Sequence, residues 1–301
     1  MPKKVTLKDI AAKAGLSPAS VSMILNRRSI DRFNAETIEQ VYAIAADLGY
    51  KSSKEKAYAL VRPSDTLIII ICPSLFNPFY TTIIQGIEIA ARKQGFVTSV
   101  RTTYWDTDTE KFIMEQARKF NVAGVIFAMI PQQPQLAYKL SKYLPVVAIG
   151  DRRSDLELAT VDMNNFTAGQ LIGKHLTDFG HKQVAYLSTT LNDQHTSRVR
   201  RYQGLEDACK TAGAKLSLFT QEITSDYELS HVEVEYSTGY ELAKRCLEAA
   251  PETTAIVAIN DMVAYGAYNA IIDRGLRIPE DISLCGFDNI FPSHLRGISL
   301  T

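Results

Sequence analysis

Apolar positions in the first fifty residues recur at the spacing of short helices. The apolar face of the first predicted helix consists of Leu7, Ile10, Ala11 and Ala14, at i, i+3, i+4 and i+7. Gly15 can adopt the left-handed backbone that ends a helix, Ser17 can cap the next helix, and Pro18 suits its first turn. The pattern therefore predicts two short helices joined by a tight turn.

A second and a third helix complete this region. The inward residues of the second are Val21, Ile24 and Leu25, and its outward residues, mostly small and neutral, are Ala19, Ser20, Ser22, Met23 and Asn26. The third is predicted to be capped by Asn34 and to end at Gly49. Its apolar stripe is Ile38, Val41, Tyr42, Ala45 and Leu48. Three helices of this kind predict a small, independent domain.

From Ser64 onward, short apolar runs alternate with helical patterns. The predicted strands cover residues 67–71, 125–127, 146–149, 184–187, 255–259 and 282–284. The predicted helices cover residues 79–94, 109–120, 166–179, 201–212, 239–249 and 262–274. The runs are too short to span a bilayer and are typical of strands buried on both faces. This alternation predicts parallel sheets covered by helices, and roughly 240 residues favour two such layered units over one.

Charge separates the two regions of the chain. The whole chain carries 33 Lys and Arg and 33 Asp and Glu. Residues 1–62 hold eleven basic and six acidic side chains, a net charge of +5, so residues 63–301 carry −5. A merely solvated helical hairpin is the alternative interpretation of the N-terminal serines and lysines. The agreement of cap, turn and spacing with this basic charge favours DNA binding instead.

The segment from Thr6 to Asn26, followed by Leu48-Gly49-Tyr50, resembles the helix-turn-helix headpiece of the LacI/GalR family of bacterial transcription regulators. The resemblance implies that the second helix lies in the major groove. The residues that it implies contact the DNA backbone are Thr6, Ser17, Ser20, Ser22 and Asn26. Those that it implies face base edges are Pro18, Ala19 and Met23, and Tyr50 is counted with the same interface.

The chain departs from the family pattern at two places in this region. Met23 stands where the family usually has an arginine that contacts guanine, which predicts an unusual operator read partly through thymine methyl groups. Ser52-Ser53 replaces a Pro-Asn pair before a hinge helix, expected within residues 51–64, whose leucine enters the minor groove. Leu60 is the candidate for that leucine. A plain charged linker is the alternative for this segment.

The resemblance continues through the body, on motifs such as Asn77-Pro78-Phe79-Tyr80, Asn260-Asp261-Met262 and Gly286-Phe287-Asp288. It implies an α/β fold of the periplasmic-binding-protein type, in which two doubly wound parallel-sheet subdomains surround a cleft. The expected domains are a headpiece over 1–50, a hinge over 51–64, and an effector-binding and dimerisation domain over 65–301.

The same resemblance sets the expected division of the body. The first subdomain should comprise about residues 65–162 and 292–301, and the second about 163–291, with crossings near 162–165 and 289–293. Ile298-Ser299-Leu300-Thr301 resembles the start of a strand after which family members complete the first subdomain. We therefore expect either a truncated product or a natural variant.

Polar residues follow several predicted strands, at the end where ligands bind in parallel sheets. The resemblance implies that the effector is contacted by Asp151, Arg201, Asn260 and Asp288, with Asn77, Phe79 and Tyr80 completing the site. Carboxylates, amides and a guanidinium fork suit the hydroxyl groups of a sugar. The alternatives are helix caps or strand-end turns for the acids Asp261 and Asp288, and a solvated face for Arg198, Arg200 and Arg201.

Catalytic signatures are missing from the sequence. It contains no Gly-x-x-x-x-Gly-Lys loop, no Gly-x-Ser-x-Gly elbow and no His-Glu-x-x-His pair. The four cysteines are widely spaced, which predicts reduced, buried thiols and no metal cluster. No signal peptide or membrane span is evident, which predicts a cytoplasmic location without membrane partners.

We therefore predict neither an enzyme nor a cofactor, but a ligand-responsive repressor. It is expected to bind double-stranded operator DNA as a homodimer and to respond to a small sugar. The alternatives are a cytoplasmic sugar-binding or sugar-modifying protein with a degenerate DNA-binding head, and a regulator that responds to a purine or to a partner protein.

Overall fold

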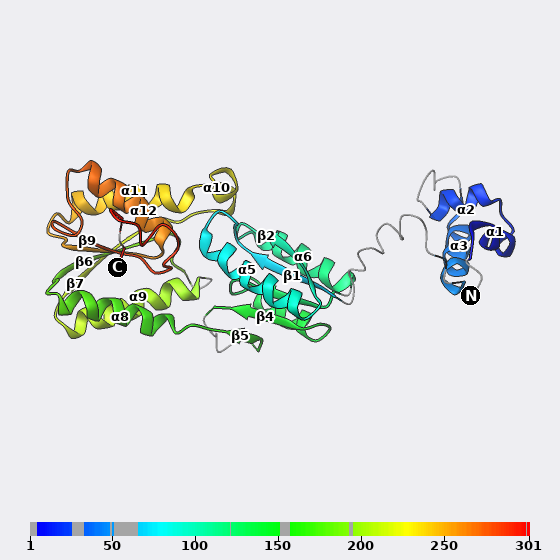
Figure 1. Cartoon of the computed structure of the whole chain (residues 1–301), viewed down its shortest axis with the longest axis horizontal. Helices are drawn as coiled ribbons and strands as arrows, with labels where there is room; N and C mark the ends of the chain where they lie inside the picture. Colours follow the sequence, from blue (N-terminus) through cyan, green and yellow to red (C-terminus); the bar gives the residue numbers. More distant parts are fainter. Residues whose placement is uncertain are drawn as a thin grey trace. The chain divides into compact units, whose positions relative to one another are not determined.

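The chain forms two compact units, residues 1–63 and 64–301, each with its own hydrophobic core (Figure 1). The computed structural model describes residues 5–25, 33–48, 50, 66–120, 122–150, 157–192, 195–298 and 300–301. Four sequence predictions lie outside these residues: the DNA contact by Asn26, the end of the third helix at Gly49, the hinge helix of 51–64 with Leu60, and the effector contact by Asp151.

The described part of the N-terminal unit contains three short helices. They are α1 (Leu7–Ala14), α2 (Pro18–Leu25) and α3 (Ala35–Asp47). Gly15 ends α1 at a φ of 66°, and Ser17 Oγ accepts from the Ser20 amide at 3.0 Å at the start of α2. Asn34 Oδ1 accepts from the Thr37 amide at 2.7 Å, so the predicted caps and turn are confirmed.

The core of this unit joins the inward faces of all three helices. Its fully buried members are Ile10, Val21, Ile24 and Val41. Tyr42 belongs to the predicted stripe of α3 but lies at the edge of the core, where its hydroxyl donates to the Ile24 carbonyl at 3.0 Å. Packing of α1 and α3 against one side of α2 therefore fixes which side of α2 remains exposed.

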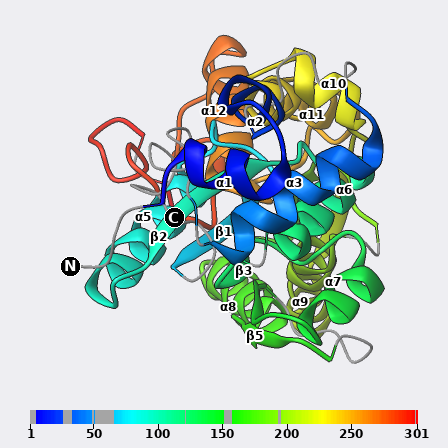
Figure 2. The ribbon, with the colours of Figure 1, turned by 90° about the vertical axis from the view of Figure 1, so that its right-hand side faces the viewer.

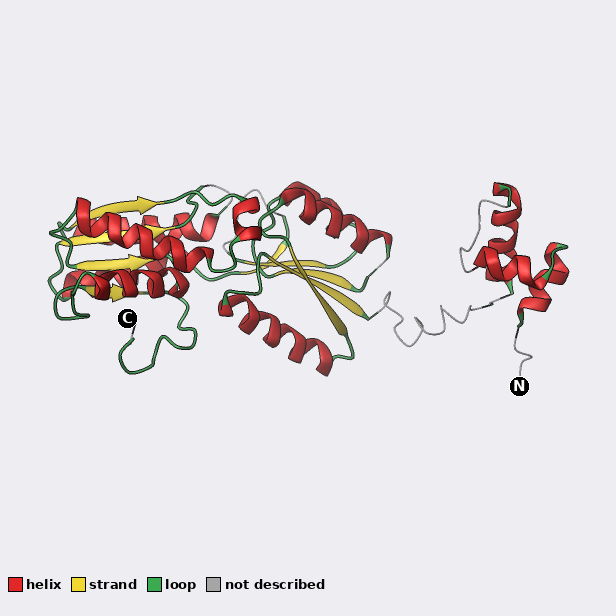
Figure 3. Ribbon diagram, turned by 90° about the horizontal axis from the view of Figure 1, so that it is seen from above, coloured by secondary structure: helices red, strands yellow, loops and turns green. Residues whose placement is uncertain are grey.

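The first lobe, residues 66–161, is built around a five-stranded parallel sheet of order β2-β1-β3-β4-β5. The strands are β1 (Leu67–Cys72), β2 (Val97–Thr102), β3 (Gly124–Phe127), β4 (Val146–Ile149) and β5 (Ala159–Val161). The helices are α5 (Pro78–Lys93), α6 (Thr107–Lys119) and α7 (Pro134–Ser141). Figure 3 shows helices on both sides of these strands.

The central strand of the first lobe explains its uninterrupted apolar sequence. Ile70 and Cys72 of β1 pack against the face covered by α5. Ile69 and Ile71, which point the other way, pack with residues of α6 and α7. Because successive side chains of a strand alternate between its faces, a strand covered on both faces needs apolar residues throughout.

The second lobe, residues 165–301, repeats this architecture with a four-stranded parallel sheet of order β7-β6-β8-β9. The strands are β6 (Gln183–Ser188), β7 (Lys215–Thr220), β8 (Ala255–Ala258) and β9 (Ser283–Cys285). The helices are α8 (Asn165–Asp178), α9 (Thr196–Thr211), α10 (Ser225–Ser230), α11 (Val234–Ala249) and α12 (Asp261–Asp273). Figures 1 and 2 show the α8–α9 pair on one side of this lobe and the α11–α12 pair on the other.

The predicted assignment of the last ten residues to the first subdomain is wrong. The Thr301 amide donates to the Leu284 carbonyl at 3.4 Å, and the Gly286 amide donates to the Thr301 carbonyl at 3.0 Å. Leu300 packs on the core of the second lobe. The segment that begins near residue 292 therefore stays with the second lobe, because its backbone pairs beside β9, and the second predicted crossing does not occur in the described residues.

The elements that the sequence patterns missed lie mainly at the margins of the two sheets. They are β2, β5, β7, α7 and α10. Among the described residues, no helix combines the length and apolarity needed to cross a bilayer, and no group of three or more His, Cys, Asp or Glu is placed to hold a metal ion.

Candidate functional site

The exposed start of α2 presents the residues that the sequence assigns to DNA bases. Pro18 and Ala19 are exposed, and Met23, one turn further on, is half-buried. All three belong to one short helix whose opposite side carries Val21 and Ile24 into the core. A rigid, small-residue helix end of this kind fits the width of a major groove.

The predicted phosphate contacts lie at the start of α1 and along the first turns of α2. Ser17 is exposed, and its hydroxyl lies 2.9 Å from that of Ser20. The Thr6 amide and hydroxyl both donate to Asp9 Oδ2 at 2.7 Å, so a phosphate would compete with Asp9 for this hydroxyl. Ser22 is half-buried, and Tyr50 packs against the core of the unit. The DNA roles of these residues remain predictions.

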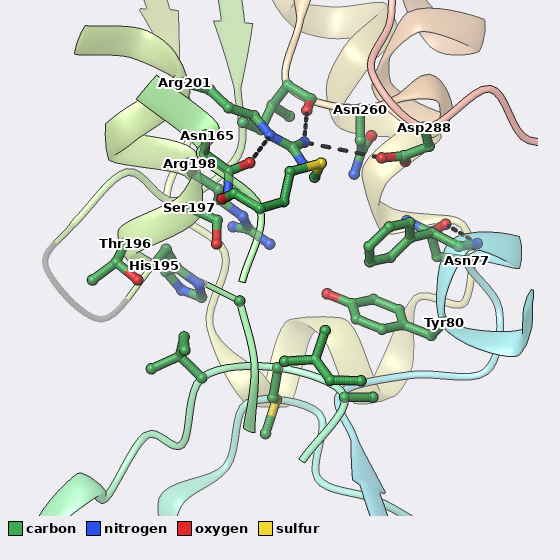
Figure 4. Close-up of a pocket in the computed structure, with 18 of the residues that line it drawn as sticks. Asn77, Tyr80, Asn165, His195, Thr196, Ser197, Arg198, Arg201, Asn260 and Asp288 are labelled. Atoms are coloured by element: carbon green, nitrogen blue, oxygen red, sulfur yellow. Dashed lines mark hydrogen bonds and ion pairs between the residues drawn. The ribbon is translucent and has the colours of Figure 1, made fainter. Parts of the chain in front are cut away.

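A cleft of about 210 Å³ is lined by residues of both lobes of the larger unit. Figure 4 shows labelled side chains from several elements directed toward this space. Six of the seven effector residues predicted from the sequence line it: Asn77, Phe79, Tyr80, Arg201, Asn260 and Asp288. The structure thus brings together residues that are up to 211 positions apart in the sequence.

Arg201 is held at the second-lobe wall of the cleft by contacts on several sides. Its Nε donates to Asn165 Oδ1 at 2.7 Å, and its Nη1 donates to the Ile259 carbonyl at 2.8 Å. The guanidinium lies over the Phe287 ring, 4.4 Å from its centroid. Because the fork is fixed before a ligand arrives, it can offer its remaining N–H groups at little entropic cost.

The predicted helix of residues 201–212, which would begin at Arg201, has the wrong start. Helix α9 begins at Thr196, so Arg201 lies inside it. The earlier start brings Ser197 and Arg198 into the lining of the cleft. A buried arginine interrupts the apolar stripe by which a helix is recognised, and for this reason the first turns of α9 carried no amphipathic pattern.

Asp288 faces Arg201 across the second-lobe side of the cleft. Its Oδ1 lies 3.9 Å from Arg201 Nη1, and its side chain is only 4% exposed. Burial raises the pKa of Asp288 to about 7, and the Arg201 charge at this long separation offsets only part of that effect. Asp288 is therefore poised between an acceptor and a donor near neutral pH.

The loop that carries Asp288 is organised by a carboxylate that does not line the cleft. Asp261 Oδ1 accepts from the amides of Phe287 and Asp288 at 2.8 and 3.0 Å, and its Oδ2 accepts from the Ile290 amide at 3.0 Å. The Ser293 hydroxyl also donates to Oδ2. Asp261 thus fixes the backbone on which Asp288 is presented, a positioning role that agrees with the turn alternative for this residue.

Asn77 and Asn260 face one carboxylate that the sequence analysis missed. Asn77 Nδ2 donates to Glu235 Oε2 at 2.7 Å, and Asn260 Nδ2 donates to Glu235 Oε1 at 2.8 Å. The Oδ1 atoms of the two asparagines accept from the amides of Phe79 and Val263, which caps α5 and α12. Because Asn77 belongs to the first lobe and Glu235 to the second, this chain of hydrogen bonds connects the lobes.

Aromatic side chains form the rest of the wall. Phe79 and Tyr80 pack edge to face with centroids 5.3 Å apart, and burial raises the pKa of Tyr80, so its hydroxyl stays protonated. Trp105 packs edge to face on His195 at 4.5 Å. Burial lowers the pKa of His195 to about 2, so this ring is neutral. Of these four, the sequence analysis found only Phe79 and Tyr80.

Two features mark Trp105 as a candidate site residue, one in the sequence and one in the structure. Trp105 is the single tryptophan of the chain, and it follows β2, an edge strand that the pattern did not predict. It has a φ of 58°, a left-handed backbone that is uncommon for a bulky residue and is often found at ligand sites. Only the backbone of the structure reveals this second feature.

Replacing Asp288 with asparagine is expected to flatten the pH dependence of stability. The folded-state pKa of about 7 lies above the unfolded value of about 3.9, so this carboxyl favours the fold most at low pH and loses that contribution as the pH rises toward 7. Burial also raises the pKa of Glu228 to about 7, so this carboxyl group likewise stabilises the fold most at low pH. Urea unfolding of wild type and Asp288→Asn between about pH 5 and 8 measures the difference, and parallel curves would contradict it.

The comparisons with known proteins cover both units. Residues 6–53 match the family model for bacterial regulatory proteins of the lacI family, and residues 65–301 match that for periplasmic binding proteins and the sugar binding domain of the LacI family. The HTH-type transcriptional repressor PurR of Mannheimia succiniciproducens is 31% identical, over 98% of this chain and 85% of its own.

Two solved structures are similar along much of the chain. The lac repressor dimer bound to operator and the anti-inducer ONPF gives a TM-score of 0.64 at 24% identity, covering 97% of this chain and 84% of its own. A LacI family regulator from Enterococcus faecium with bound ribose gives a TM-score of 0.62 at 26% identity, covering 75% of this chain and 78% of its own.

Proposed function

The chain belongs to the LacI family of bacterial regulatory proteins, and from this premise we propose that it represses transcription by binding operator DNA and responds to a small sugar in its cleft. The observation that carries the proposal is the joint presence of an exposed helix-turn-helix end and a preorganised polar cleft in one chain. The similar repressor of Mannheimia succiniciproducens supports a repressor over an activator or an enzyme.

The chemistry of the cleft supports a polyol effector. Arg201 supplies fixed donors, Asp288 can accept or donate, and the Tyr80 hydroxyl is a protonated donor. Apolar walls from Phe79 and Trp105 suit the flat C–H face of a pyranose or furanose ring. The ribose in the similar Enterococcus faecium regulator agrees with this choice.

Regulation is proposed to work through the hydrogen bonds that join the lobes. The Asn77–Glu235–Asn260 chain exists only while the two lobes keep their present arrangement. An effector that contacts both lobes changes the relative free energies of alternative arrangements, and it can shift DNA affinity only by that difference. A homodimer is part of the proposal, because one small headpiece neutralises few phosphates and a two-fold pair reads two half-sites.

Operator binding tests the proposal directly. The purified chain is titrated with DNA from upstream of its own gene and with random DNA, at two salt concentrations. Sugars and purine bases are then added as effectors. Selective operator binding that one sugar strengthens or weakens supports the proposal. If only a purine changes operator binding, the effector is a purine and the proposed sugar is wrong. Weak, fully salt-sensitive binding to both DNAs would favour a sugar-binding protein with a degenerate head.

Replacing Met23 with arginine is expected to shift base preference within the half-site toward guanine. A two-pronged arginine contact discriminates against the wrong base by about 1–3 kcal/mol, whereas the half-buried methionine offers only apolar contact. Affinities for a set of half-site variants measure the shift, with the salt slope nearly unchanged. The control is Ala12→Arg, which adds the same charge on the exposed side of α1 and should leave base preference as it was.

A further inference from the structure

Two small cavities adjoin the cleft on the side of α10 and α11. One, of about 30 Å³, shares Trp105, His195, Arg198 and Glu235 with the cleft, and the other, of about 20 Å³, shares Asn77, Tyr80, Trp105 and Glu235 with it. Both are lined by Trp105, Glu228, Val234 and Glu235. We call these two cavities together the annex. Because the annex borders the cleft, one ligand can occupy both.

The carboxyl group of Glu228 is placed in the annex by local hydrogen bonds. The Thr190 hydroxyl accepts from the Ile223 amide at 2.8 Å, which ties the segment before α10 to the end of β6. Thr224 then caps α10 by accepting from the Tyr227 amide at 3.3 Å. The chain is therefore held to the rest of the second lobe two residues before α10 begins.

The two acids of the annex differ in what they already bind. Each oxygen of Glu235 accepts a hydrogen bond from an asparagine amide. The carboxyl group of Glu228 is half-buried and forms no hydrogen bond or ion pair with any residue that the structure describes, although its backbone amide donates to the Thr224 carbonyl. Burial raises its pKa to about 7, the charge of Glu235 adds to this effect, and Arg198 opposes it. Glu228 is thus a carboxyl group without a partner at the edge of a ligand cleft.

A second polar group of the annex also lacks a partner. Thr189 is 2% exposed and lines the larger cavity, and its hydroxyl oxygen has no hydrogen-bond partner within the described part of the chain. A buried hydroxyl without a partner is unfavourable, so its position beside a cavity is consistent with a polar group that enters from outside the chain. The two cavities of the annex, about 20 and 30 Å³, have room for a group of only a few atoms.

We propose that the annex binds a protonated amino group of the effector, which makes an amino sugar the effector class. The amine would donate to Glu228 and to Thr189, while the sugar ring lies in the cleft beside Arg201 and Asp288. This inference rests on the proposed sugar-responsive function and narrows it. It also assigns Glu228, Thr189 and Trp105 as the residues that set specificity.

The charges and shape of the annex favour an amine over an anion or a hydroxyl. Two carboxyl groups face one guanidinium, whose Nη1 already donates to the Thr190 carbonyl at 3.1 Å. An anion would meet this acidic pair, and a hydroxyl would add no positive charge to balance the second carboxyl group. An ammonium group provides the counter-charge, while the Trp105 ring, over which the Arg198 guanidinium lies 5.4 Å from the centroid, forms an apolar wall beside it.

Matched sugar pairs test the annex through the single tryptophan. Fluorescence of Trp105 is followed while wild type is titrated at pH 7 with glucose against glucosamine, and galactose against galactosamine. In at least one pair we expect the amino sugar to bind about ten-fold or more tightly than its parent, as for a charge-assisted hydrogen bond. Glu228→Gln should reduce this preference to about two-fold or less and leave binding of the parent sugar nearly unchanged.

Asp226→Asn is the matched control, because Asp226 is an exposed acid of the same helix and should leave the preference intact. Equal affinities within every pair, no binding by any amino sugar, or a preference that survives Glu228→Gln would each overturn the proposal. The operator titration is independent of these outcomes. If DNA binding is selective and the amine preference is absent, the annex proposal fails and the proposed repressor function stands.

Discussion

Replacing Gly204 with alanine is expected to destabilise the second lobe by about 3 kcal/mol or more. Gly204 lies at the contact between α8 and α9, and a Cβ added there would be 1.9 Å from the Phe166 carbonyl oxygen and 2.9 Å from the Gln170 amide nitrogen. Both neighbours are backbone atoms of α8, so no side-chain rotation can relieve the overlap. The two helices must move apart, which weakens the core that Leu205 and Leu176 help to form.

Gly86→Ala provides the matched control for this substitution. Gly86 also lies inside a helix, α5, and an added Cβ there would meet no atom within 4 Å. Because alanine favours helix over glycine, this variant should be unchanged or more stable by up to about 1 kcal/mol. Urea unfolding of the three proteins measures both effects. Similar midpoints for Gly204→Ala and wild type would show that α8 and α9 are not packed this closely.

Replacing Arg201 with alanine is expected to abolish the response to the effector while operator binding persists. The substitution removes a donor to the ligand and leaves Asn165 Oδ1 and the buried carboxyl of Asp288 without their cation. Loss of a charged hydrogen-bonding group in a buried site corresponds to roughly 3 kcal/mol, or a rise of about 100-fold in the effector Kd. The N-terminal unit has its own core and should keep its affinity for DNA.

Arg200→Ala is the control for this prediction. Arg200 precedes Arg201 in α9 but is exposed, and it contacts the Phe166 ring at 5.2 Å. Its loss should change effector binding by no more than about two-fold. Operator binding is measured for both variants over a range of effector concentrations. An unaltered half-maximal concentration for Arg201→Ala would remove this residue from the binding site.

The sequence predicted those parts of the fold that depend on buried, regular patterns. Ile69 to Ile71 in β1 and Ala255 to Ala258 in β8 are covered on both faces, so their apolar runs are unmistakable. Lys215–Thr220, the edge strand β7, alternates polar and apolar residues and was missed. Edge strands and short helices keep one side in solvent, and their patterns resemble those of loops.

Some residues of the candidate site could likewise be predicted from the sequence, and others could not. Asn260 and Asp288 follow recognisable strands whose ends converge, and the family resemblance implied these two residues and Arg201 as effector contacts. Glu235 and Glu228 follow no such strand. Their roles depend on a loop, on α10 and on Asn77 of the other lobe. Such long-range encounters leave no local pattern.

The sequence by itself determined the helix-turn-helix head, the alternation of strands and helices, the separation of charge and the family. These properties depend on caps, periodicity and composition, which are set by residues close together in the chain. Only the tertiary structure decided that residues 300–301 pair beside β9, that Trp105 turns into the cleft with a left-handed backbone, and that the half-buried carboxyl group of Glu228 borders the annex. Each of these depends on which distant surfaces pack together, and the free energy of that packing is shared among many residues.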